Sequence, residues 1–287
     1  MEKILDGRTL ADKLNSQLKD VIEKFVEKIG VPPKLATVLV GNDPASEVYV
    51  NIKHKTCANV GINSIMVKLS TNITKDQLFN EIDKLNGDVS VHGILLQLPL
   101  PDPLRPFTPE FLEHISPIKD VDGFHPINKG KLFDYNEELA PCTPKGIIAL
   151  LEHYKVEIKR KNVTIINRSN LVGKPLIFMI LKRNGTPTVC HTSTKDLDQC
   201  IKQADILVVA VGHAKFITKD KIKEGVVIID VGMNKVEGKL CGDVDFEDVL
   251  EKCRMITPVP GGCGPMTVAF LMQNTFTAYK KQTTPKN

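Results

Sequence analysis

Apolar and polar residues follow two spacings along the chain. From Thr9 to Ile29 the apolar residues recur every three to four positions, which is the spacing of one face of an α-helix. Shorter runs that are β-rich or almost continuously apolar are typical of buried parallel strands. Together with proline and glycine stops, these patterns predict helices at 9–29, 44–60 and 75–86 and strands at 35–41, 64–69 and 91–100.

The same alternation resumes after Pro141. Strands are predicted at 162–167, 186–191, 205–212 and 225–232, and helices at 146–154, from 175 and at 197–203. A loop rich in proline and glycine then precedes a last apolar helix. Because strands that alternate with helices form parallel sheets, we predict an α/β protein of two lobes, the second of them Rossmann-like.

Composition supports a folded protein and narrows its partners. The 287 residues suffice for two domains, and the chain is 42% hydrophobic and 25% charged. Its net charge of +4 is spread along the chain, so we expect no nucleic-acid partner. The chain starts without a signal-peptide pattern, and no apolar run approaches the roughly 18 residues of a membrane span. We therefore expect a cytoplasmic location and no membrane partner.

The cysteines and histidines do not form a recognisable metal motif. None of the seven cysteines is spaced C-x-x-C, and the chain lacks H-E-x-x-H. We expect neither a disulfide framework nor a metal site.

Polar residues of the first half are candidates for chemistry. Tyr49 and Lys53 stand four apart on a predicted helix, so they share one face, although unrelated surface pairs have the same spacing. Gln97 lies in an apolar strand, where a buried amide without partners costs about 1–3 kcal/mol, so we expect it to have a polar partner. It also lies at the carboxyl end of that strand, where ligands gather. Asp120 and Asp122 precede a glycine, which fits a turn and a substrate site equally well.

Three loops of the second half are candidate ligand contacts. The turn at 167–175 leads into a helix whose N-terminus can face a phosphate, although such turns are common without a ligand. Segment 190–194 offers a histidine and hydroxyls where NAD-binding units usually carry a ribose-binding acid. With Arg168 nearby, the site suits the 2′-phosphate of NADP better, unless Arg168 forms a surface ion pair. Glycines in the loop at 257–267 let a ligand approach the backbone closely.

Six motifs in a fixed order carry a family resemblance. They are YVNIK (49–53), GILLQLPLP (93–101), KDVDGF (119–124), NRSNLVGKP (167–175), DVGMN (230–234) and TPVPGGCGPMT (257–267). In this combination the chain resembles the bifunctional methylenetetrahydrofolate dehydrogenase/cyclohydrolase family. Any one motif alone would be weak, whereas six in order make chance similarity improbable.

The resemblance implies two activities in one cleft, namely oxidation of 5,10-methylenetetrahydrofolate with NADP and hydrolysis of the methenyl product to 10-formyltetrahydrofolate. It implies a homodimer through the cofactor lobe and a place in the one-carbon metabolism that serves purine, histidine and methionine biosynthesis. It also implies a folate-binding catalytic domain at 1–121, on which a helix at about 266–282 packs back, and an NADP-binding Rossmann-like domain at 122–287.

By the same resemblance Lys53 is the key catalytic residue and Gln97 tunes it, while Tyr49 is an aromatic lid and Asp122 anchors the pterin. The physical argument agrees, because a lysine is a poor base at neutral pH unless its surroundings favour the neutral amine, which we expect Gln97 to do. The implied substrate-binding residues are Tyr49, Lys53, Gln97, Leu98, Asp122, Pro260, Gly261 and Gly262.

The cofactor lobe departs from the family pattern at a few positions. Asn167 stands where the turn usually begins with glycine, Thr192 replaces a common serine, and Met233 replaces a common isoleucine. Asparagine tolerates the left-handed backbone better than most residues, and Thr192 keeps the hydroxyl. NADP is the expected cofactor and NAD the alternative. The implied cofactor-binding residues are Asn167, Arg168, Ser169, Val172, His191, Thr192, Ser193 and Met233.

Three other functions compete with the bifunctional enzyme. A monofunctional dehydrogenase of the same family, with NAD as an alternative cofactor, is disfavoured by the intact Lys53 and Gln97. A non-catalytic folate or nucleotide sensor is disfavoured by the complete motifs. An amino-acid or shikimate-type dehydrogenase would share the parallel sheets but has no reason to contain QLPLP or PGGCGPMT.

Overall fold

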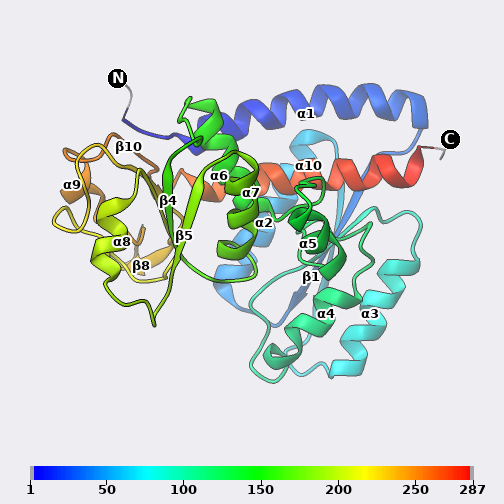
Figure 1. Ribbon diagram of the computed structural model, residues 1–287. Coiled ribbons are helices and arrows are strands. Elements are labelled where there is room, and N and C mark those ends of the chain that lie inside the picture. The colour runs from blue at the N-terminus through cyan, green and yellow to red at the C-terminus, as the bar shows by residue number, and fades with distance from the viewer. Residues whose placement is uncertain (1–2, 285–287) are drawn as a thin grey trace. The chain divides into compact units, whose positions relative to one another are not determined.

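Two parallel sheets organise the chain, as the alternation of strands and helices predicts (Figure 1). The computed structural model describes residues 3–284. It divides into two compact units. Unit 1 contains the residues up to 12, 132–137 and 141–267, and unit 2 contains 13–131, 138–140 and the residues from 268. The predicted α/β fold class is confirmed.

Unit 2 is built on a three-stranded parallel sheet. Its strands, in the order β2-β1-β3, are β2 (Asn63–Leu69), β1 (Lys34–Val40) and β3 (Gly93–Leu96). The central strand is buried from Leu35 to Val40, which explains why its sequence is nearly continuously apolar. The Gln97 N–H donates to the Val38 carbonyl at 2.9 Å and continues the β3 pairing by one residue.

Local sequence signals set the ends of the helices that follow β1 and β2. The α2 helix (Pro44–Val60) starts at Asp43, whose carboxylate accepts from the Ser46 N–H at 2.8 Å, and ends at Gly61 with φ 83°. The α3 helix (Lys75–Gly87) starts with a capping box formed by Thr74 and Gln77. Both starts agree with the sequence prediction.

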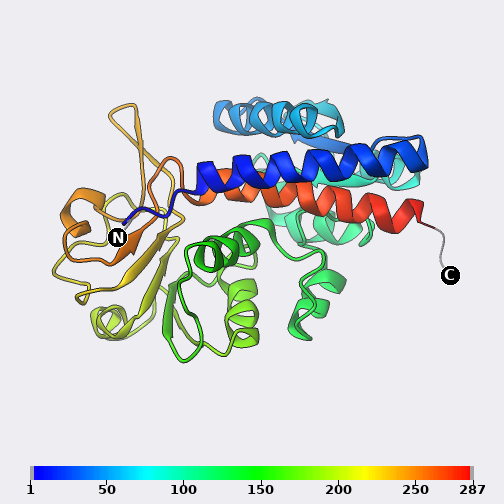
Figure 2. The same cartoon turned by 90° about the horizontal axis from the view of Figure 1, so that it is seen from above.

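Two long helices, α1 (Gly7–Ile29) and α10 (Cys263–Thr283), begin in unit 1 and continue into unit 2, where they run side by side, as Figure 2 shows. The ring of Phe25 on α1 meets those of Phe276 and Tyr279 on α10 edge-on, with centroids 5.6 and 5.5 Å apart. The α10 side chain of Asn274 donates to the Val121 carbonyl at 2.8 Å. The C-terminal helix is thereby tied to the segment that contains Asp122.

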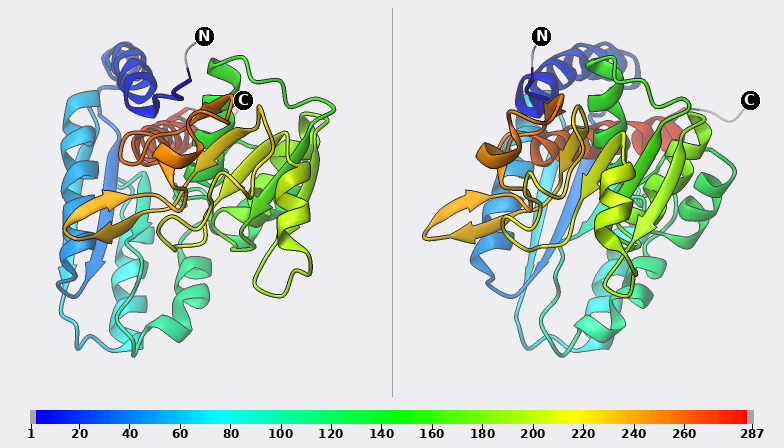
Figure 3. Two further views of the ribbon diagram at one scale, coloured as in Figure 1. Left: turned by 90° about the vertical axis from the view of Figure 1, so that its left-hand side faces the viewer. Right: turned by 60° about the vertical axis from the view of Figure 1, so that its left-hand side comes forward.

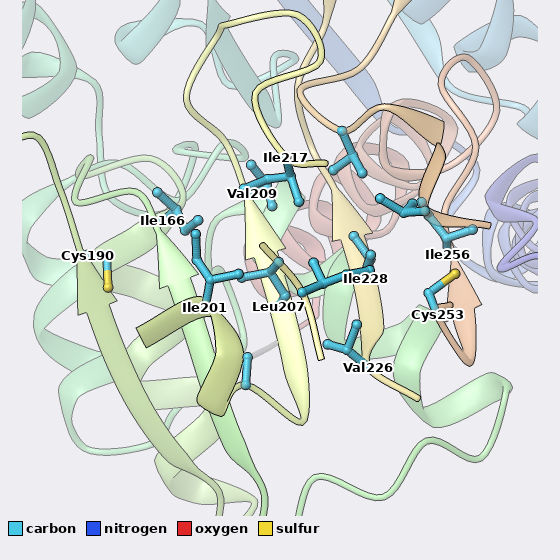
Figure 4. Close-up of a cluster of buried hydrophobic side chains, with 14 residues drawn as sticks. Ile166, Cys190, Ile201, Leu207, Val209, Ile217, Val226, Ile228, Cys253 and Ile256 are labelled. Carbon is cyan, nitrogen blue, oxygen red and sulfur yellow. The ribbon is translucent and has the colours of Figure 1, made fainter. Parts of the chain in front are cut away.

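Unit 1 contains a five-stranded parallel sheet in the order β10-β7-β6-β4-β5. Its strands are β4 (Asn162–Ile166), β5 (Thr186–Cys190), β6 (Ile206–Val209), β7 (Val227–Asp230) and β10 (Met255–Ile256), and its helices are α6 (Cys142–His153), α7 (Gly173–Lys182), α8 (Leu197–Gln203) and α9 (Phe246–Val249). Ile166, Leu207 and Ile228 belong to the buried cluster over this sheet (Figure 4). Because β5 and β6 flank β4 on opposite sides, the strand order reverses beside β4, where α/β sheets bind ligands.

The short polar elements are the ones that periodicity does not predict. They are η1 (Arg105–Phe107), α4 (Thr108–His114), α5 (Pro126–Phe133), α9 and the hairpin of β8 (Asn234–Val236) and β9 (Lys239–Cys241), which Figure 3 shows in gold. The prediction of a strand over 91–100 is wrong at its ends, since only Gly93–Leu96 pairs as a strand. Prolines at 99 and 101 lack the N–H groups that would extend it. The predicted helix start at 175 is also wrong, since α7 begins at Gly173.

Candidate functional site

A lysine, an amide and a carboxylate come together in unit 2. Lys53 projects from the third turn of α2, and its Nζ donates to Gln97 Oε1 at 2.9 Å. Gln97 follows directly after β3, at the carboxyl end of the sheet. The structure therefore supplies the polar partner that the apolar surroundings of Gln97 require.

The amide of Gln97 has one fixed orientation. Its Nε2 donates to the Leu98 carbonyl at 2.6 Å, which leaves Oε1 to face Lys53. An amide oxygen accepts a hydrogen bond from an amine and from an ammonium alike. The contact therefore fixes the direction of the Lys53 side chain. That Gln97 tunes Lys53 stays a prediction.

The two aspartates of the KDVDGF motif have different environments. The Asp120 carboxylate accepts from the backbone N–H groups of Phe124 and His125 at 3.0 and 2.9 Å and from Asn128 Nδ2 at 2.8 Å. It is 2% exposed and organises the turn into α5. Asp122 instead lies in the electrostatic field of Lys53. The structure thus gives Asp120 a role in the turn, and Asp122 remains the candidate site residue of this motif.

The negative charge of Asp122 is unfavourable in the folded protein. Burial raises its pKa to about 6, although the positive charge of Lys53 opposes the rise and the negative charge of Asp120 adds to it. A carboxyl group with this pKa is ionised at neutral pH at a cost in folding free energy. A ligand that donates hydrogen bonds to such a group stabilises its ionised form.

Tyr49 lies one helical turn before Lys53 on α2 and is partly buried. Burial raises the pKa of its phenol. The ring is therefore neutral and partly shielded from solvent, as a surface that stacks against a flat ligand needs to be.

The turn after β4 in unit 1 is held by the side chain of Asn167. Its Nδ2 donates to the Ala210 carbonyl at 2.6 Å, and its Oδ1 accepts from the Ser169 and Gly173 N–H groups at 2.8 and 3.0 Å. A Cβ on Gly173 would lie 2.1 Å from the Asn167 carbonyl oxygen, so only glycine fits there. Asn167 is thus a structural residue of the turn.

These contacts change one expectation about phosphate binding. The first N–H of α7, at Gly173, is bonded to Asn167, and the N–H of Lys174 donates to the Ser169 carbonyl at 3.0 Å. The third residue is Pro175, which has no N–H. The amides of this helix start are therefore committed to the turn, and side chains have to supply the donors for a phosphate.

Arg168 is an available donor of that kind. Its side chain is exposed, and it forms no ion pair with any residue between 3 and 284, so the surface ion pair considered from the sequence is absent from that part of the chain. The loop after β5 lies at the same edge of the sheet, and there His191 Nδ1 accepts from the Ser193 N–H at 3.2 Å. Thr192 and Ser193 are exposed in this loop.

The remaining predicted residues lie elsewhere in their units. Leu98 adjoins Gln97 and accepts its amide hydrogen bond. Val172 is partly buried and precedes α7, whereas Met233 is 44% exposed after β7. Pro260 is exposed, and its peptide bond to Val259 is cis.

The glycines at 261 and 262 have a structural reason within unit 1. Gly261 has a φ of 117°, and a Cβ on Gly262 would lie 2.7 Å from the Pro258 carbonyl oxygen. A Cβ on Gly7 would lie 2.0 Å from the Gly262 carbonyl oxygen, and the Gly261 carbonyl accepts from the Arg8 N–H at 2.8 Å. This loop therefore packs tightly on the start of α1.

Two residues that the sequence analysis did not single out stand at the carboxyl edge of the unit 1 sheet. Asp230 is 3% exposed and Asp243 is fully buried. A carboxylate at the end of a continuous apolar strand was the available signal for Asp230, since such a group needs several donors. Among residues 3–284 no cluster of three or more His, Cys, Asp or Glu side chains could hold a metal ion.

The fold and the site define a two-unit α/β protein, with a dinucleotide-binding type of sheet in one unit and a Lys–Gln–Asp cluster in the other. Comparison with known proteins gives the family. Residues 5–122 match the profile described as tetrahydrofolate dehydrogenase/cyclohydrolase, catalytic domain, and residues 141–283 match that of its NAD(P)-binding domain. The chain belongs to the tetrahydrofolate dehydrogenase/cyclohydrolase family.

Relatives and solved structures agree along the whole chain. The bifunctional protein FolD of Halalkalibacterium halodurans is 50% identical over 97% of this chain and 99% of its own. The crystal structure of the Campylobacter jejuni FolD methylenetetrahydrofolate dehydrogenase/cyclohydrolase superposes with a TM-score of 0.93 at 46% identity, covering 98% of this chain and 100% of that one. The Trypanosoma brucei enzyme, solved with NADP and an inhibitor, gives 0.94 at 33% identity over 99% of both chains.

Proposed function

We propose that this chain oxidises 5,10-methylenetetrahydrofolate with NADP and hydrolyses the resulting methenyltetrahydrofolate to 10-formyltetrahydrofolate. The contact between Lys53 and Gln97, with Asp122 in the electrostatic field of Lys53, is the observation that carries the proposal. It lies within the segment that matches the family's catalytic domain. The names of the relatives, which combine dehydrogenase and cyclohydrolase, support the same pair of reactions.

The dehydrogenase step needs positioning more than acid or base catalysis. When bound, NADP supplies the acceptor for the hydride that leaves the methylene carbon. In our proposal Tyr49 stacks on the folate, and Leu98 and Gln97 border it at the end of β3. Holding the reacting carbon in line accounts for most of the rate gain in such a transfer.

The hydrolysis step needs a proton carrier, and we assign that role to Lys53. Water attacks the cationic methenyl carbon, and the amine of Lys53 accepts the proton that the water loses. The same proton then passes to the N5 nitrogen as its bond to the carbon breaks. The remaining hydroxyl proton is released to solvent as the C=O bond forms, which leaves the formyl group on N10. Gln97 keeps the amine pointed at the reacting carbon, because its own amide is fixed by Leu98.

Asp122 is the proposed anchor for the pterin ring. The ring offers N–H donors, and a partly buried carboxylate with a raised pKa gains from donors that replace lost water.

We assign the cofactor to the crevice beside β4 in unit 1. Arg168 is the proposed partner of the 2′-phosphate, because it is exposed and free of ion pairs within residues 3–284. Ser169, Thr192 and Ser193 add hydroxyl donors, and Asn167 holds the turn. The remaining proposed contacts are Val172, His191 and Met233 for the cofactor and Pro260, Gly261 and Gly262 for the substrate.

The test is an assay that follows the two reactions separately. The protein is given methylenetetrahydrofolate with NADP or NAD, and reduced cofactor and methenyl absorbance are recorded. We expect reduced cofactor with NADP, a slower rate with NAD, and a methenyl signal that decays as hydrolysis proceeds. No reduction of either cofactor would refute the assignment, and a stable methenyl signal would indicate a monofunctional dehydrogenase.

We also propose that the chain forms a homodimer through unit 1. Exposed apolar side chains of unit 1 support this, namely Phe133, Tyr135 and Leu181, whose exposures are 65%, 45% and 40%. The ring of Phe133 lies 5.2 Å from that of Phe178 on α7. Sedimentation of the purified protein tests the proposal, and a single species of 31.8 kDa would contradict it.

The predicted division at residues 121 and 122 and the cytoplasmic location remain part of the proposal. Across residues 3–284 no helix is long and apolar enough to cross a membrane. Expression of 122–287 alone tests the division, which predicts that this fragment binds NADPH. Cell fractionation tests the location, and recovery of the protein outside the cytoplasmic fraction would contradict it.

A further inference from the structure

Two buried carboxylates lie in a reciprocal arrangement at the carboxyl edge of the unit 1 sheet. A Cβ on Gly232 would lie 2.2 Å from the Asp243 carboxyl carbon, and one on Gly242 would lie 1.8 Å from Asp230 Oδ2. Asp243 therefore occupies the space beside Gly232, which is close to Asp230 in the sequence, and Asp230 occupies the space beside Gly242, which is close to Asp243. No larger residue fits at either glycine, so the chain is built around these two carboxylates.

Asp243 uses its side chain to hold a loop that is distant in sequence. Its Oδ2 accepts from the backbone N–H groups of Val211 and Gly212 at 2.6 and 3.0 Å, and its Oδ1 accepts from Asn234 Nδ2 at 2.9 Å. Both N–H groups belong to the loop that follows β6. A fully buried carboxylate with three donors fixes that loop more firmly than neutral acceptors would.

Asp230 holds Asp243 in place in turn. Its Oδ1 accepts from the N–H groups of Gly232 and Asp243 at 2.9 and 3.0 Å, and its Oδ2 accepts from the Val244 N–H at 2.9 Å. The position of Asp243 is therefore set by the end of β7, which belongs to the rigid sheet. Figure 4 shows β6 and β7 side by side in that sheet.

The loop held by Asp243 is also bonded to the proposed cofactor turn. Asn167, at the start of that turn, donates to the carbonyl of Ala210, the residue before Val211. One loop is thus fixed from two sides, by an amide from the end of β4 and by a carboxylate from the end of β7. It stands where the strand order reverses, which is the position of the ligand in sheets of this kind.

We propose that Asp243 is a positioning residue for the dinucleotide, acting through the loop at 210–212. The inference rests on the proposed function, namely that unit 1 binds NADP. The carboxylate turns two consecutive N–H groups inward and so sets the backbone face that the loop presents to the cofactor. A loop that is already ordered lowers the entropic cost of binding, and for this reason Asp243 strengthens cofactor binding without touching the cofactor.

Asp243→Ala tests this role, because it leaves the Val211 and Gly212 N–H groups without their acceptor. We expect the Kd for NADPH, measured by the fluorescence of the bound nicotinamide, to rise about 10- to 100-fold. The KM for NADP should rise in parallel. Methenyl hydrolysis, which depends on Lys53 in unit 2, should keep its kcat. General destabilisation of the protein would instead lower both NADPH binding and hydrolysis.

A matched control is Asp205→Ala at the opposite edge of the same sheet. Asp205 accepts from the Asn162 N–H at 2.8 Å and from Lys223 at 2.6 Å, so it also ties a loop to a strand. We expect this variant to lose stability and to bind NADPH as the wild type does. An equal loss of NADPH affinity in both variants would overturn the proposal.

Asp243→Asn covers the case in which the alanine variant does not fold. Its carbonyl oxygen can still accept from Val211 and Gly212, while its NH₂ group meets Asn234, whose amide can rotate. We expect the Kd for NADPH to rise about two- to tenfold, since a neutral acceptor is weaker. An unchanged Kd in a folded Asp243 variant overturns the inference, whereas a wild type that binds no NADPH refutes the proposed function instead.

Discussion

The Lys53 cluster of unit 2 and the Asn167 turn of unit 1 both contain polar side chains, but these side chains differ in how far the protein itself supplies their partners. In the turn, the Asn167 side chain makes three hydrogen bonds to its own surroundings. In the cluster, Asp122 has a pKa raised to about 6, which means that its charge is poorly compensated by the protein. The polar side chain of the turn has its hydrogen-bond partners without a ligand, whereas the carboxylate of the cluster has none among residues 3–284.

This difference distinguishes a region that is built to bind a ligand, the Asn167 turn, from a region whose groups take part in the reaction, the Lys53 cluster. A turn that completes its own hydrogen bonds has a fixed shape, and a few exposed side chains such as Arg168 can then meet a charged ligand. A cluster with an uncompensated charge is held at the expense of stability, as is common where a site performs chemistry. Substitutions should therefore lower stability in the first region and raise it in the second.

The largest effect is expected from Lys53→Met, which keeps the bulk of the side chain and removes the amine. Methenyl hydrolysis should fall by about 10³-fold, because a positioned proton carrier contributes about 10²- to 10⁴-fold. Folate binding should remain, since Tyr49 and Asp122 are unchanged. Decay of methenyl absorbance measures the first quantity, and equilibrium binding of the folate measures the second.

Lys55→Met is the matched control for that variant. Lys55 lies on the same helix and is exposed, so its loss should leave hydrolysis within about twofold of the wild type. Comparable hydrolysis in the two variants would remove Lys53 from its proposed role.

Arg168→Ala should have the next largest effect, and only on the cofactor. Hydrogen bonds to charged groups contribute about 1.5–3 kcal/mol, so the KM for NADP should rise about 10- to 100-fold. The KM for NAD, which lacks the 2′-phosphate, should not change, and neither should hydrolysis. Steady-state kinetics with both cofactors provides the measurement.

Arg254→Ala serves as its control, because Arg254 is exposed at the opposite edge of the same sheet, next to the start of β10. It should leave both KM values unchanged. If Arg168→Ala raises the KM for NAD and NADP equally, Arg168 does not contact the 2′-phosphate.

Local signals were the ones that could be predicted from the sequence. The starts of α2 and α3 depend on residues within three positions, such as Thr74 and Gln77, so their patterns are visible along the chain. Gln97 could be predicted to need a partner, because an amide in an apolar strand must bond to something. That Lys53 is this partner came from the family resemblance, since the two are 44 positions apart.

The partners of the buried carboxylates could not be predicted from the sequence. Asp120 and Asp122 carry the same side chain, but the fold brings hydrogen-bond donors from the following turn to Asp120, whereas Asp122 meets the charge of Lys53 from another helix. Asp243 was missed because its partners, Val211 and Gly212, are 32 and 31 residues away. A pair of Asp residues, each near a glycine, was the signal that could have indicated a reciprocal contact.

Asn167→Ala tests whether the turn in unit 1 depends on the hydrogen bonds of its own side chain. It removes the acceptor for two backbone N–H groups and the donor to Ala210, so we expect the free energy of unfolding to fall by about 2 kcal/mol. Urea denaturation followed by circular dichroism measures this change. Asn170→Ala, three residues later and exposed, should change the free energy by less than about 0.5 kcal/mol. Equal stability of Asn167→Ala and the wild type would mean that the turn does not depend on this side chain.

Asp122→Asn is expected to have the smallest effect and the opposite sign. The folded-state pKa of Asp122 is about 6 and its ordinary value is 3.8, so the protonated form is favoured by folding. Its contribution is complete below pH 4 and is lost as the pH rises through 6. The neutral amide should therefore raise the free energy of unfolding at pH 7.5 by about 1 kcal/mol and leave it unchanged near pH 4.

Urea denaturation at the two pH values measures this difference, with Asp20→Asn, an exposed carboxylate on α1, as the control that should change neither. Folate affinity should fall in Asp122→Asn even as stability rises, because an amide cannot replace a charged acceptor for the N–H donors of the pterin. A variant that is destabilised at pH 7.5 would show that the protein already compensates the charge of Asp122. The contrast between a satisfied turn and an uncompensated cluster would then no longer hold.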